Sequence, residues 1–334
     1  MILTVTLNPS LDRSIEVGRL ERGEVNRATS ASLDPGGKGV NVSRALLANG
    51  VPSCAVVPCG GDEGGQLIRL LVAEGVDVRA VPIVGPTRSN ITITEPDGTT
   101  TKINEPGPAL SPGEFAAVAE QALAAAGPDG WVVACGSAPP GLPTSAFAEF
   151  CHRVVGAGLH LVVDTSGPAL RAAAVAGAAL LKPNRAELAE VVGRPLVSVR
   201  DVVAAARELR SWGAGAVLAS LGADGAVLVD GHGVVTGDAP VVRPRSSVGA
   251  GDALLAGFLA VTVARNAPPR VPPSEKQTEN HTSGSRRALH EALAWGAAAV
   301  SLPGSRMPGP ADLSRDRVRI DSQPDEVRPL LASG

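Results

Sequence analysis

The most informative segment of the sequence is 246-SSVGAGDALLAGFLAVTVA-264, in which small residues lead directly into an apolar run. We expect a helix over 249–264. Its glycines let the main chain approach an anion, and the first N–H groups of the helix would point at that anion. Asp252 falls in this first turn. A carboxylate beside a bound anion can also reach an attacking hydroxyl, so Asp252 is a candidate general base. A helix-capping role would explain the residue equally well.

A second glycine-rich segment, 35-PGGKGVNVSR-44, also opens a predicted helix. It lacks the G-x-x-x-x-G-K-[ST] spacing of a P-loop. Its glycines allow a ligand to lie against the main chain, while Lys38 and Asn41 offer a charge and an amide. The segment therefore predicts a site for a phosphate or a polyhydroxyl compound. The alternative is a glycine-rich turn that carries a solvated lysine.

Between these segments, short apolar runs alternate with Ala- and Leu-rich stretches. This alternation is typical of an α/β protein with a mostly parallel sheet covered on both faces. We expect strands over 2–7, 53–57, 76–83, 131–135, 159–163, 179–181, 216–220 and 226–229. We expect helices over 39–48, 64–73, 112–126, 145–155, 185–191, 198–212, 249–264 and 287–301.

Four further stretches do not follow this alternation. Residues 12–33 and 88–103 alternate polar and apolar side chains, which predicts a small separate sheet. That sheet would act as a lid over a site at the edge of the main sheet, as a dimer contact, or as both. Residues 266–285 have the composition of a flexible insertion, and the polar tail 321–334 is expected to be loosely held. Residues 1–320 would form one domain.

Composition limits the possible partners. The net charge of −3, the absence of Tyr and the low content of 4 Phe and 3 Trp argue against a nucleic-acid platform. Of the four lysines, Lys38, Lys102 and Lys182 fall in the motifs described here, either by chance or because a compact charge is needed beside phosphate. The four cysteines form no zinc-binding spacing. Without a signal-like start or an apolar run of about 18 residues, a cytoplasmic protein is expected.

The pair 36-GGKGVN-41 and 249-GAGD-252 resembles the two signatures of the ribokinase-type (PfkB) sugar kinases. Other segments resemble the branch of that family that includes 1-phosphofructokinase and tagatose-6-phosphate kinase. They are 6-TLNPSLD-12, 87-TRSNI-91, 104-NEPGP-108, 136-GSAPPG-141, 182-KPNRAEL-188, 220-SLGADG-225 and 301-SLPG-304. The similarity runs in order from the first strand to about residue 310. It implies a three-layer α/β/α ribokinase-like fold with a β-sheet lid.

The resemblance also implies a site for ATP and Mg²⁺. Asp252 would deprotonate the accepting hydroxyl, and the main-chain amides of Gly249, Ala250 and Gly251 would hold the transferred phosphate. Glu187 would organise Mg²⁺ through water, unless it is only a helix-surface acid. The family positions for the nucleotide match Lys182, Asn184, Ser220, Gly222 and Gly225 as well as Glu187.

On the sugar side, the resemblance implies contacts from Asp12, Gly37, Asn41 and Ser137 to the sugar. Lys38 and Arg88 would bind the phosphate that the sugar already carries. Arg27 and Lys102 both lie in the predicted lid strands. The simpler interpretation is that their charges are solvated, and the alternative is that they contact the phosphate.

We expect a kinase that converts fructose 1-phosphate to fructose 1,6-bisphosphate and forms a homodimer through its lid. Tagatose-6-phosphate or fructose-6-phosphate kinase is the nearest rival, and a non-catalytic sugar-phosphate-binding regulator is the alternative of another class. A nicotinamide-dependent oxidoreductase is excluded, because 8-NPSLD-12 stands where G-x-G-x-x-G would be needed.

Overall fold

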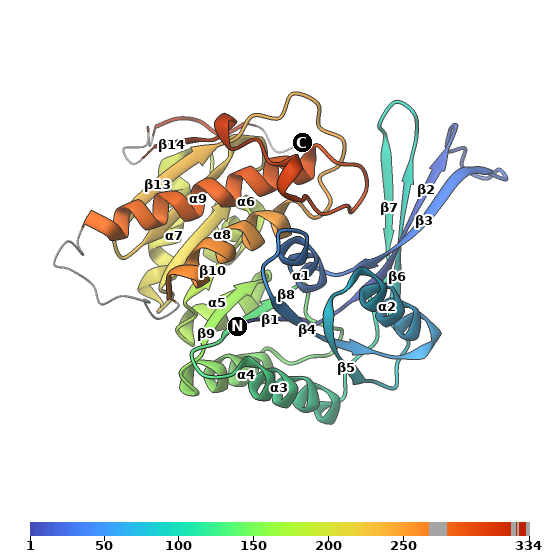
Figure 1. Ribbon diagram of the computed structural model, residues 1–334, viewed down its shortest axis with the longest axis horizontal. Coiled ribbons are helices and arrows are strands. Elements are labelled where there is room, and N and C mark those ends of the chain that lie inside the picture. Colours follow the sequence, from blue (N-terminus) through green and yellow to red (C-terminus); the bar gives the residue numbers. More distant parts are fainter. Residues whose placement is uncertain (267–278, 322–324, 326, 332–334) are drawn as a thin grey trace.

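The computed structural model describes residues 1–266, 279–321, 325 and 327–331. Its main element is a ten-stranded sheet in the order β14-β13-β12-β11-β10-β9-β8-β1-β4-β5 (Figure 1). The strands are β1 (Ile2–Thr6), β4 (Ser53–Cys59), β5 (Asp77–Pro82), β8 (Trp131–Cys135), β9 (His160–Asp164), β10 (Leu180–Leu181), β11 (Ala216–Ser220), β12 (Ala226–Asp230), β13 (Gly233–Asp238) and β14 (Arg319–Asp321).

The strand pairing in this sheet changes from parallel to antiparallel once. All neighbours from β5 to β11 are parallel, whereas β11, β12, β13 and β14 pair antiparallel. The central strands β1 and β8 are fully buried and mostly apolar, as expected for strands covered on both faces. The expectation of a mostly parallel sheet is confirmed.

Helices cover both faces of the sheet, which gives three layers (Figure 1). One face packs against α3 (Pro112–Ala126), α4 (Thr144–Gly156), α5 (Gly167–Val175), α6 (Arg185–Val192) and α7 (Val199–Ser211). The other packs against α1 (Lys38–Ala48), α8 (Ala250–Asn266) and α9 (Glu279–Val300). Helix α2 (Gly61–Glu74) forms a smaller core with the base of the lid.

The lid is a separate four-stranded sheet in the order β3-β2-β6-β7 that extends away from the body (Figure 1). Its strands are β2 (Ser10–Val17), β3 (Ala28–Gly36), β6 (Arg88–Thr94) and β7 (Thr100–Asn104). Asp12 pairs with Asp34 and Asn90, whereas Ile15 pairs with Ala31 and Ile93. Because alternate residues of a strand face opposite sides, the lid has one polar face and one largely apolar face.

Four elements differ from the sequence-based expectations. Helix α5 and strands β13 and β14 were not expected, and α9 begins at Glu279, inside the stretch expected to be a flexible insertion. The rest of that insertion, 267–278, lies outside the described residues. The Gly-Pro start of α5 and the polar composition of the start of α9 indicate loops rather than helices, which is why neither helix was expected.

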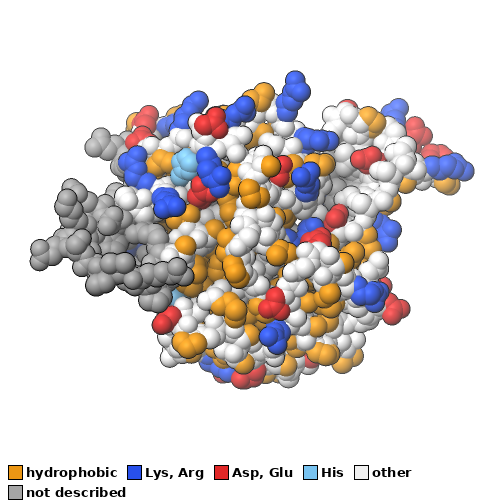
Figure 2. All heavy atoms as spheres, viewed as in Figure 1, with side chains coloured by type: hydrophobic (Ala, Val, Ile, Leu, Met, Phe, Trp, Pro, Cys, Tyr) orange, Lys and Arg blue, Asp and Glu red, His pale blue; other side chains and the backbone are white. Residues whose placement is uncertain are grey.

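The visible surface carries basic and acidic side chains interspersed over the body, without a large area of one sign (Figure 2). This agrees with the small net charge of −3. In the described part of the chain, every helix is too short or too polar to cross a membrane.

Candidate active site

Asp252 lies in the first turn of α8, beside the edge of the sheet where β8 and β9 end. Loops at the carboxyl ends of parallel strands are the usual position of a site in such folds. The side chain is 6% exposed, and its Oδ2 accepts a hydrogen bond of 2.8 Å from Nδ2 of Asn41 in α1. This partner belongs to another helix. Asp252 therefore joins the two glycine-rich segments.

The pKa of Asp252 is far from its ordinary value. Burial raises this pKa to about 6, and repulsion from Asp164 adds to the rise, while the Asn41 hydrogen bond and the charges of Lys182 and Lys38 oppose it. A carboxylate whose pKa lies close to the working pH is a suitable general base.

The backbone conformation of the turn before α8 favours glycine, because positive φ values strain residues that carry a side chain. Gly249 has a φ of 74°, and a Cβ there would lie 2.5 Å from Cε of Met307. A Cβ on Gly251 would lie 3.4 Å from Nζ of Lys182, which brings that lysine against the start of the helix. The main chain at this turn is thus bare, and a cation lies beside it.

Asp164, at the end of β9, is the centre of a charge cluster that our sequence reasoning missed. Its Oδ1 is 2.8 Å from Nζ of Lys38, and its Oδ2 is 2.9 Å from Nζ of Lys182. The second contact is an ion pair without hydrogen-bond geometry. Asp164 is completely buried. An acid directly after the buried run Leu161–Val163 is the signal that could have identified it, because parallel strands end at the site.

Lys38 also contacts Glu187, with Nζ 3.2 Å from Oε1. Burial lowers the pKa of Lys38, but attraction to Asp164 and Glu187 outweighs burial and raises this pKa well above its usual range. The ammonium is therefore charged at every relevant pH. Lys38 thus contacts the residue expected to organise Mg²⁺. The family resemblance instead implies that Lys38 binds the phosphate of the sugar together with Arg88.

The expected nucleotide residues lie on two adjacent loops. Asn184 and Glu187 form a capping box at the start of α6, and Asn184 forms a parallel β-bridge with Ser220. Glu187 thus has defined partners and is not a free surface acid.

The second nucleotide loop contains Gly222 and Gly225, whose φ values are 62° and 89°. A Cβ on Gly225 would lie 2.0 Å from the carbonyl oxygen of Gly237. The backbone alone requires this glycine, so its presence is not by itself a sign of nucleotide binding.

At the base of the lid, Asp12 accepts hydrogen bonds from Ser10 at 2.7 Å and from Asn90 at 2.9 Å. A Cβ on Gly36 would lie 2.4 Å from the carboxylate of Asp12. Gly37 follows with a φ of 116° and is the N-cap residue of α1. Asp12 is thereby held against the glycine turn that leads to Lys38 and Asn41.

Arg88 is hydrogen-bonded to main-chain carbonyls on the expected sugar side of the site. Its guanidinium donates to the carbonyl of Glu105 at 2.9 Å and to that of Asn8 at 3.3 Å. The Asn8 amide donates to Ser137 at 3.4 Å. Burial lowers the pKa of Arg88, and Asp12 and Glu105 counteract that effect. Arg88, Ser137 and Asp12 are thus connected on one side of the site.

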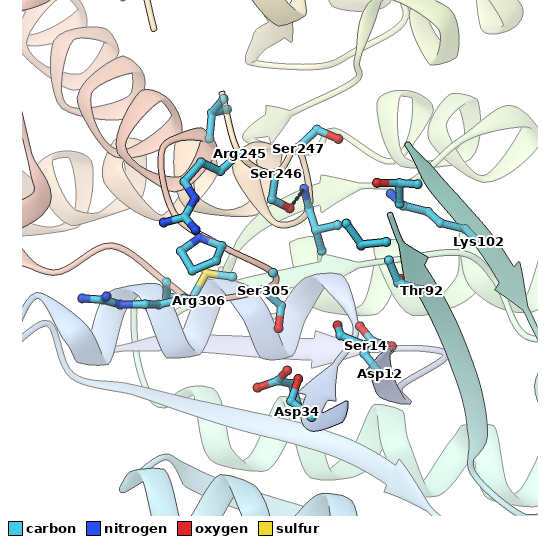
Figure 3. Close-up of a pocket in the computed structure, with 18 of the residues that line it drawn as sticks. Asp12, Ser14, Asp34, Thr92, Lys102, Arg245, Ser246, Ser247, Ser305 and Arg306 are labelled. Atoms are coloured by element: carbon cyan, nitrogen blue, oxygen red, sulfur yellow. Dashed lines mark hydrogen bonds between the residues drawn. The ribbon is translucent and has the colours of Figure 1, made fainter. Parts of the chain in front are cut away.

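A cavity of about 1130 Å³ lies between the polar face of the lid and the loops 244–248 and 303–307. Asp12 and Lys102 line it from the lid, opposite Ser246 and Ser247 (Figure 3). The cavity reaches Asp12 and the loop before Gly249. The residues that line it do not include Asp252 or the charge cluster of Asp164, Lys38 and Lys182. We place the chemistry at the cluster, because the buried charges converge there. Arg27 lies in the exposed loop between β2 and β3, outside this lining.

Among the described residues, no three His, Cys, Asp or Glu side chains are grouped so that they could hold a metal directly. Asp164 and Glu187 nevertheless flank one ammonium, and Oδ2 of Asp164 forms an ion pair with Lys182 but no hydrogen bond. Two carboxylates with spare acceptor capacity fit a hydrated Mg²⁺, which retains much of its water.

Comparisons with known proteins agree with this geometry. The model of the pfkB family carbohydrate kinases matches residues 5–308. A 1-phosphofructokinase of Rhodobacter capsulatus is 38% identical over 77% of this chain and 82% of its own length. The ATP-dependent 6-phosphofructokinase isozyme 2 of Escherichia coli is 36% identical over 80% and 86%.

Solved structures show the same likeness. The crystal structure of phosphofructokinase-2 from Escherichia coli in complex with fructose-6-phosphate has a TM-score of 0.82. It is 32% identical and covers 93% of this chain and 96% of its own. Carbohydrate kinases of this family use ATP and Mg²⁺. With a family match over most of its length, this chain belongs to the pfkB family of carbohydrate kinases, which are phosphotransferases.

Proposed function

We propose that this chain transfers the γ-phosphate of ATP to fructose 1-phosphate, with Asp252 as the general base. The observation that carries this proposal is the buried carboxylate of Asp252, which Asn41 holds in the first turn of α8 and whose pKa is raised to about 6. Asp252 would take the proton from the free primary hydroxyl. The hydroxyl oxygen would then bond to the γ-phosphorus as the bond to the β-phosphate oxygen breaks and ADP leaves.

Charge that builds on the transferred group would be held by the start of α8. The main-chain amides of Gly249, Ala250 and Gly251 would point at it, and Lys182 lies beside that turn. The nucleotide would lie along Lys182, Asn184, Ser220, Gly222 and Gly225. Glu187 would hold Mg²⁺ through water, and Asp164 offers a second carboxylate. The chemistry that Mg²⁺ would supply when bound there is neutralisation of the phosphate charge.

On the sugar side, we propose that Asp12, Gly37, Asn41 and Ser137 bind the sugar hydroxyls. Arg88 would bind the resident phosphate, with Lys38 between that phosphate and the nucleotide. Lys102 would reach the ligand from the lid, since it lines the cavity together with Asp12 (Figure 3). Arg27 would contribute only if the lid closes, because it lies in an exposed loop.

Two other ketohexose phosphates are compatible with the same cations, namely tagatose 6-phosphate and fructose 6-phosphate. One similar protein is named 1-phosphofructokinase and another 6-phosphofructokinase, so the similarity supports either position of the resident phosphate. A coupled ADP-release assay with each of the three substrates tests the proposal. We expect the highest kcat/KM with fructose 1-phosphate. A clear preference for either 6-phosphate would overturn this assignment.

A non-catalytic sugar-phosphate-binding regulator is the candidate of another class. It would bind the sugar phosphate without consuming ATP. ATP consumption that depends on sugar phosphate and disappears in Asp252→Asn would exclude it.

We further propose that two copies of the chain pair through the apolar faces of their lids. Ile91 faces Ile103 across the sheet, and Ile103 is 54% exposed. An exposed apolar sheet face indicates an interaction surface. Light scattering on the purified protein should give the mass of a dimer, and Ile103→Glu should shift it to a monomer.

The free cysteines and the use of ATP fit a cytoplasmic enzyme.

A further inference from the structure

The C-terminal tail is attached to the body at residues 328–331. The main-chain N–H of Val199 donates to the carbonyl of Arg328 at 3.1 Å, and that of Leu330 donates to the carbonyl of Val197 at 2.9 Å. Ser198 and Pro329 form an antiparallel bridge between these bonds. This part of the tail therefore pairs with the connection between α6 and α7 through an isolated β-bridge. Its polar composition had suggested a loose tail instead.

The same residues hold the second nucleotide loop. Asp224 lies in the 3₁₀ turn Gly222–Asp224, and its side chain is 8% exposed. Its carboxylate accepts a hydrogen bond of 2.8 Å from the N–H of Leu331, and the Arg328 guanidinium lies 3.4 Å away. Arg328 also donates to the carbonyl of Asp224 at 3.2 Å. A nearly buried carboxylate thus has its partners in the tail, 104 and 107 residues further along the chain.

The tail also reaches the first nucleotide loop. The guanidinium of Arg185 donates to the carbonyl of Leu331 at 2.6 Å and, through Nε, to that of Leu196 at 2.8 Å. Arg185 directly follows Asn184 and opens α6. The two loops are themselves in contact, since the N–H of Ser220 donates to the carbonyl of Pro183 at 3.0 Å. Residues 328–331 therefore link both loops from outside the proposed site.

We propose that this tail segment is a positioning element for nucleotide binding, with Arg328 as its principal residue. It holds the turn at 222–225 and the start of α6 in the arrangement that receives ATP. Loops with few buried apolar contacts open locally at little cost unless other groups hold them. Without the tail, part of the binding free energy of ATP would be used to order these loops. The inference rests on the proposed assignment of both loops to the nucleotide.

The test uses the full-length chain with Arg328→Ala, Arg328→Lys and Asp224→Asn. We measure KM for ATP, KM for sugar phosphate, binding of a non-hydrolysable ATP analogue, and amide hydrogen exchange of residues 183–187 and 220–225 without ligand. Arg328→Ala should raise KM for ATP and weaken analogue binding by about fivefold or more. Exchange of both loops should become faster, while KM for the sugar phosphate stays within about twofold. Arg328→Lys should recover part of the effect, because it retains a cation at that position.

Arg194→Ala is the matched control, since Arg194 pairs with Glu208 at 2.7 Å just beyond the other end of α6. It should leave both KM values and loop exchange unchanged. In the combined Asp224→Asn and Arg328→Ala variant, KM for ATP should rise by less than the product of the two single effects. Unchanged loop exchange in Arg328→Ala, or equal changes in both KM values, would overturn the inference. Failure of the unmodified chain to bind the ATP analogue would instead refute the proposed function, and loop exchange would still report whether the tail holds the loops.

Discussion

The central sheet and the lid differ in how their strands are buried. Every residue of β1 and β8 is buried, whereas every residue of β6 is half-buried and β7 is mostly exposed. A strand buried on both faces cannot move without opening the core, but a strand with one free face can. The body can therefore hold buried charges in place, and the lid can adapt to a ligand. Changes in the body should alter turnover or stability, and changes in the lid should alter the KM for the sugar.

The largest expected effect is on turnover and comes from a substitution in the body. Asp252→Asn should lower kcat by about 10³-fold, because a general base contributes roughly 10²- to 10⁴-fold. Nucleotide binding should remain, and a coupled assay together with calorimetric titration of an ATP analogue measures both. Asp316→Asn makes the same change at an exposed position and should leave kcat unchanged. Activity of Asp252→Asn within tenfold of the unmodified enzyme would rule out this role for Asp252.

The next effect concerns the stability of the body. Asp164→Asn removes the buried carboxylate that faces both Lys38 and Lys182. Loss of one partner of a buried ion pair costs about 3–5 kcal/mol, so the free energy of unfolding in urea should fall by about 3 kcal/mol. Glu120→Gln, in an exposed pair with Arg153, should cost less than about 0.5 kcal/mol. Equal losses in the two variants would mean that the cluster does not stabilise the body.

At the junction of lid and body, Arg88→Ala should act on the sugar phosphate. We expect KM for this substrate to rise by about 30-fold, because a charge-assisted contact to phosphate is worth about 2 kcal/mol. KM for ATP should stay within about twofold if the two sides of the site are independent. Arg19→Ala, at an exposed lid position, is the control for a general effect of charge. A parallel rise in both KM values would contradict the separation of the two sides.

The pH dependence of turnover tests the environment of the base. Since burial raises the pKa of Asp252 to about 6, the reactive carboxylate is present above pH 6 and is lost as the pH falls. The value of kcat/KM should fall about tenfold for each pH unit below 6 and level off above it. An ordinary exposed acid would keep full activity down to about pH 4. A profile that is flat between pH 4 and 6 would be incompatible with Asp252 as a buried base.

The smallest effect is expected from the lid itself. Lys102→Ala should raise KM for the sugar phosphate by about threefold without changing kcat, because an exposed cation adds about 0.7 kcal/mol or less. The effect should shrink as salt rises. A loss of kcat would show that the lid takes part in turnover.

Much of the fold could be predicted because periodicity reports burial directly. The mostly apolar composition of β1 and the alternating pattern of β6 indicated their environments correctly. Helix α5 was missed because its first residues, Gly167 and Pro168, read as a loop. Strands β13 and β14 pair antiparallel at the edge of the sheet, and neither has the long apolar run of a central strand. Such edge elements depend on a neighbour for their hydrogen bonds.

The layered fold and the family could be predicted from the chain alone, because glycine spacing and apolar periodicity are local properties. Folding was needed to bring Asp164 between Lys38 and Lys182 and Arg328 to Asp224. These contacts unite residues 18 to 126 positions apart. Charge partners of this kind leave no periodic trace, since the attraction between two ions depends on their separation in space and on their burial.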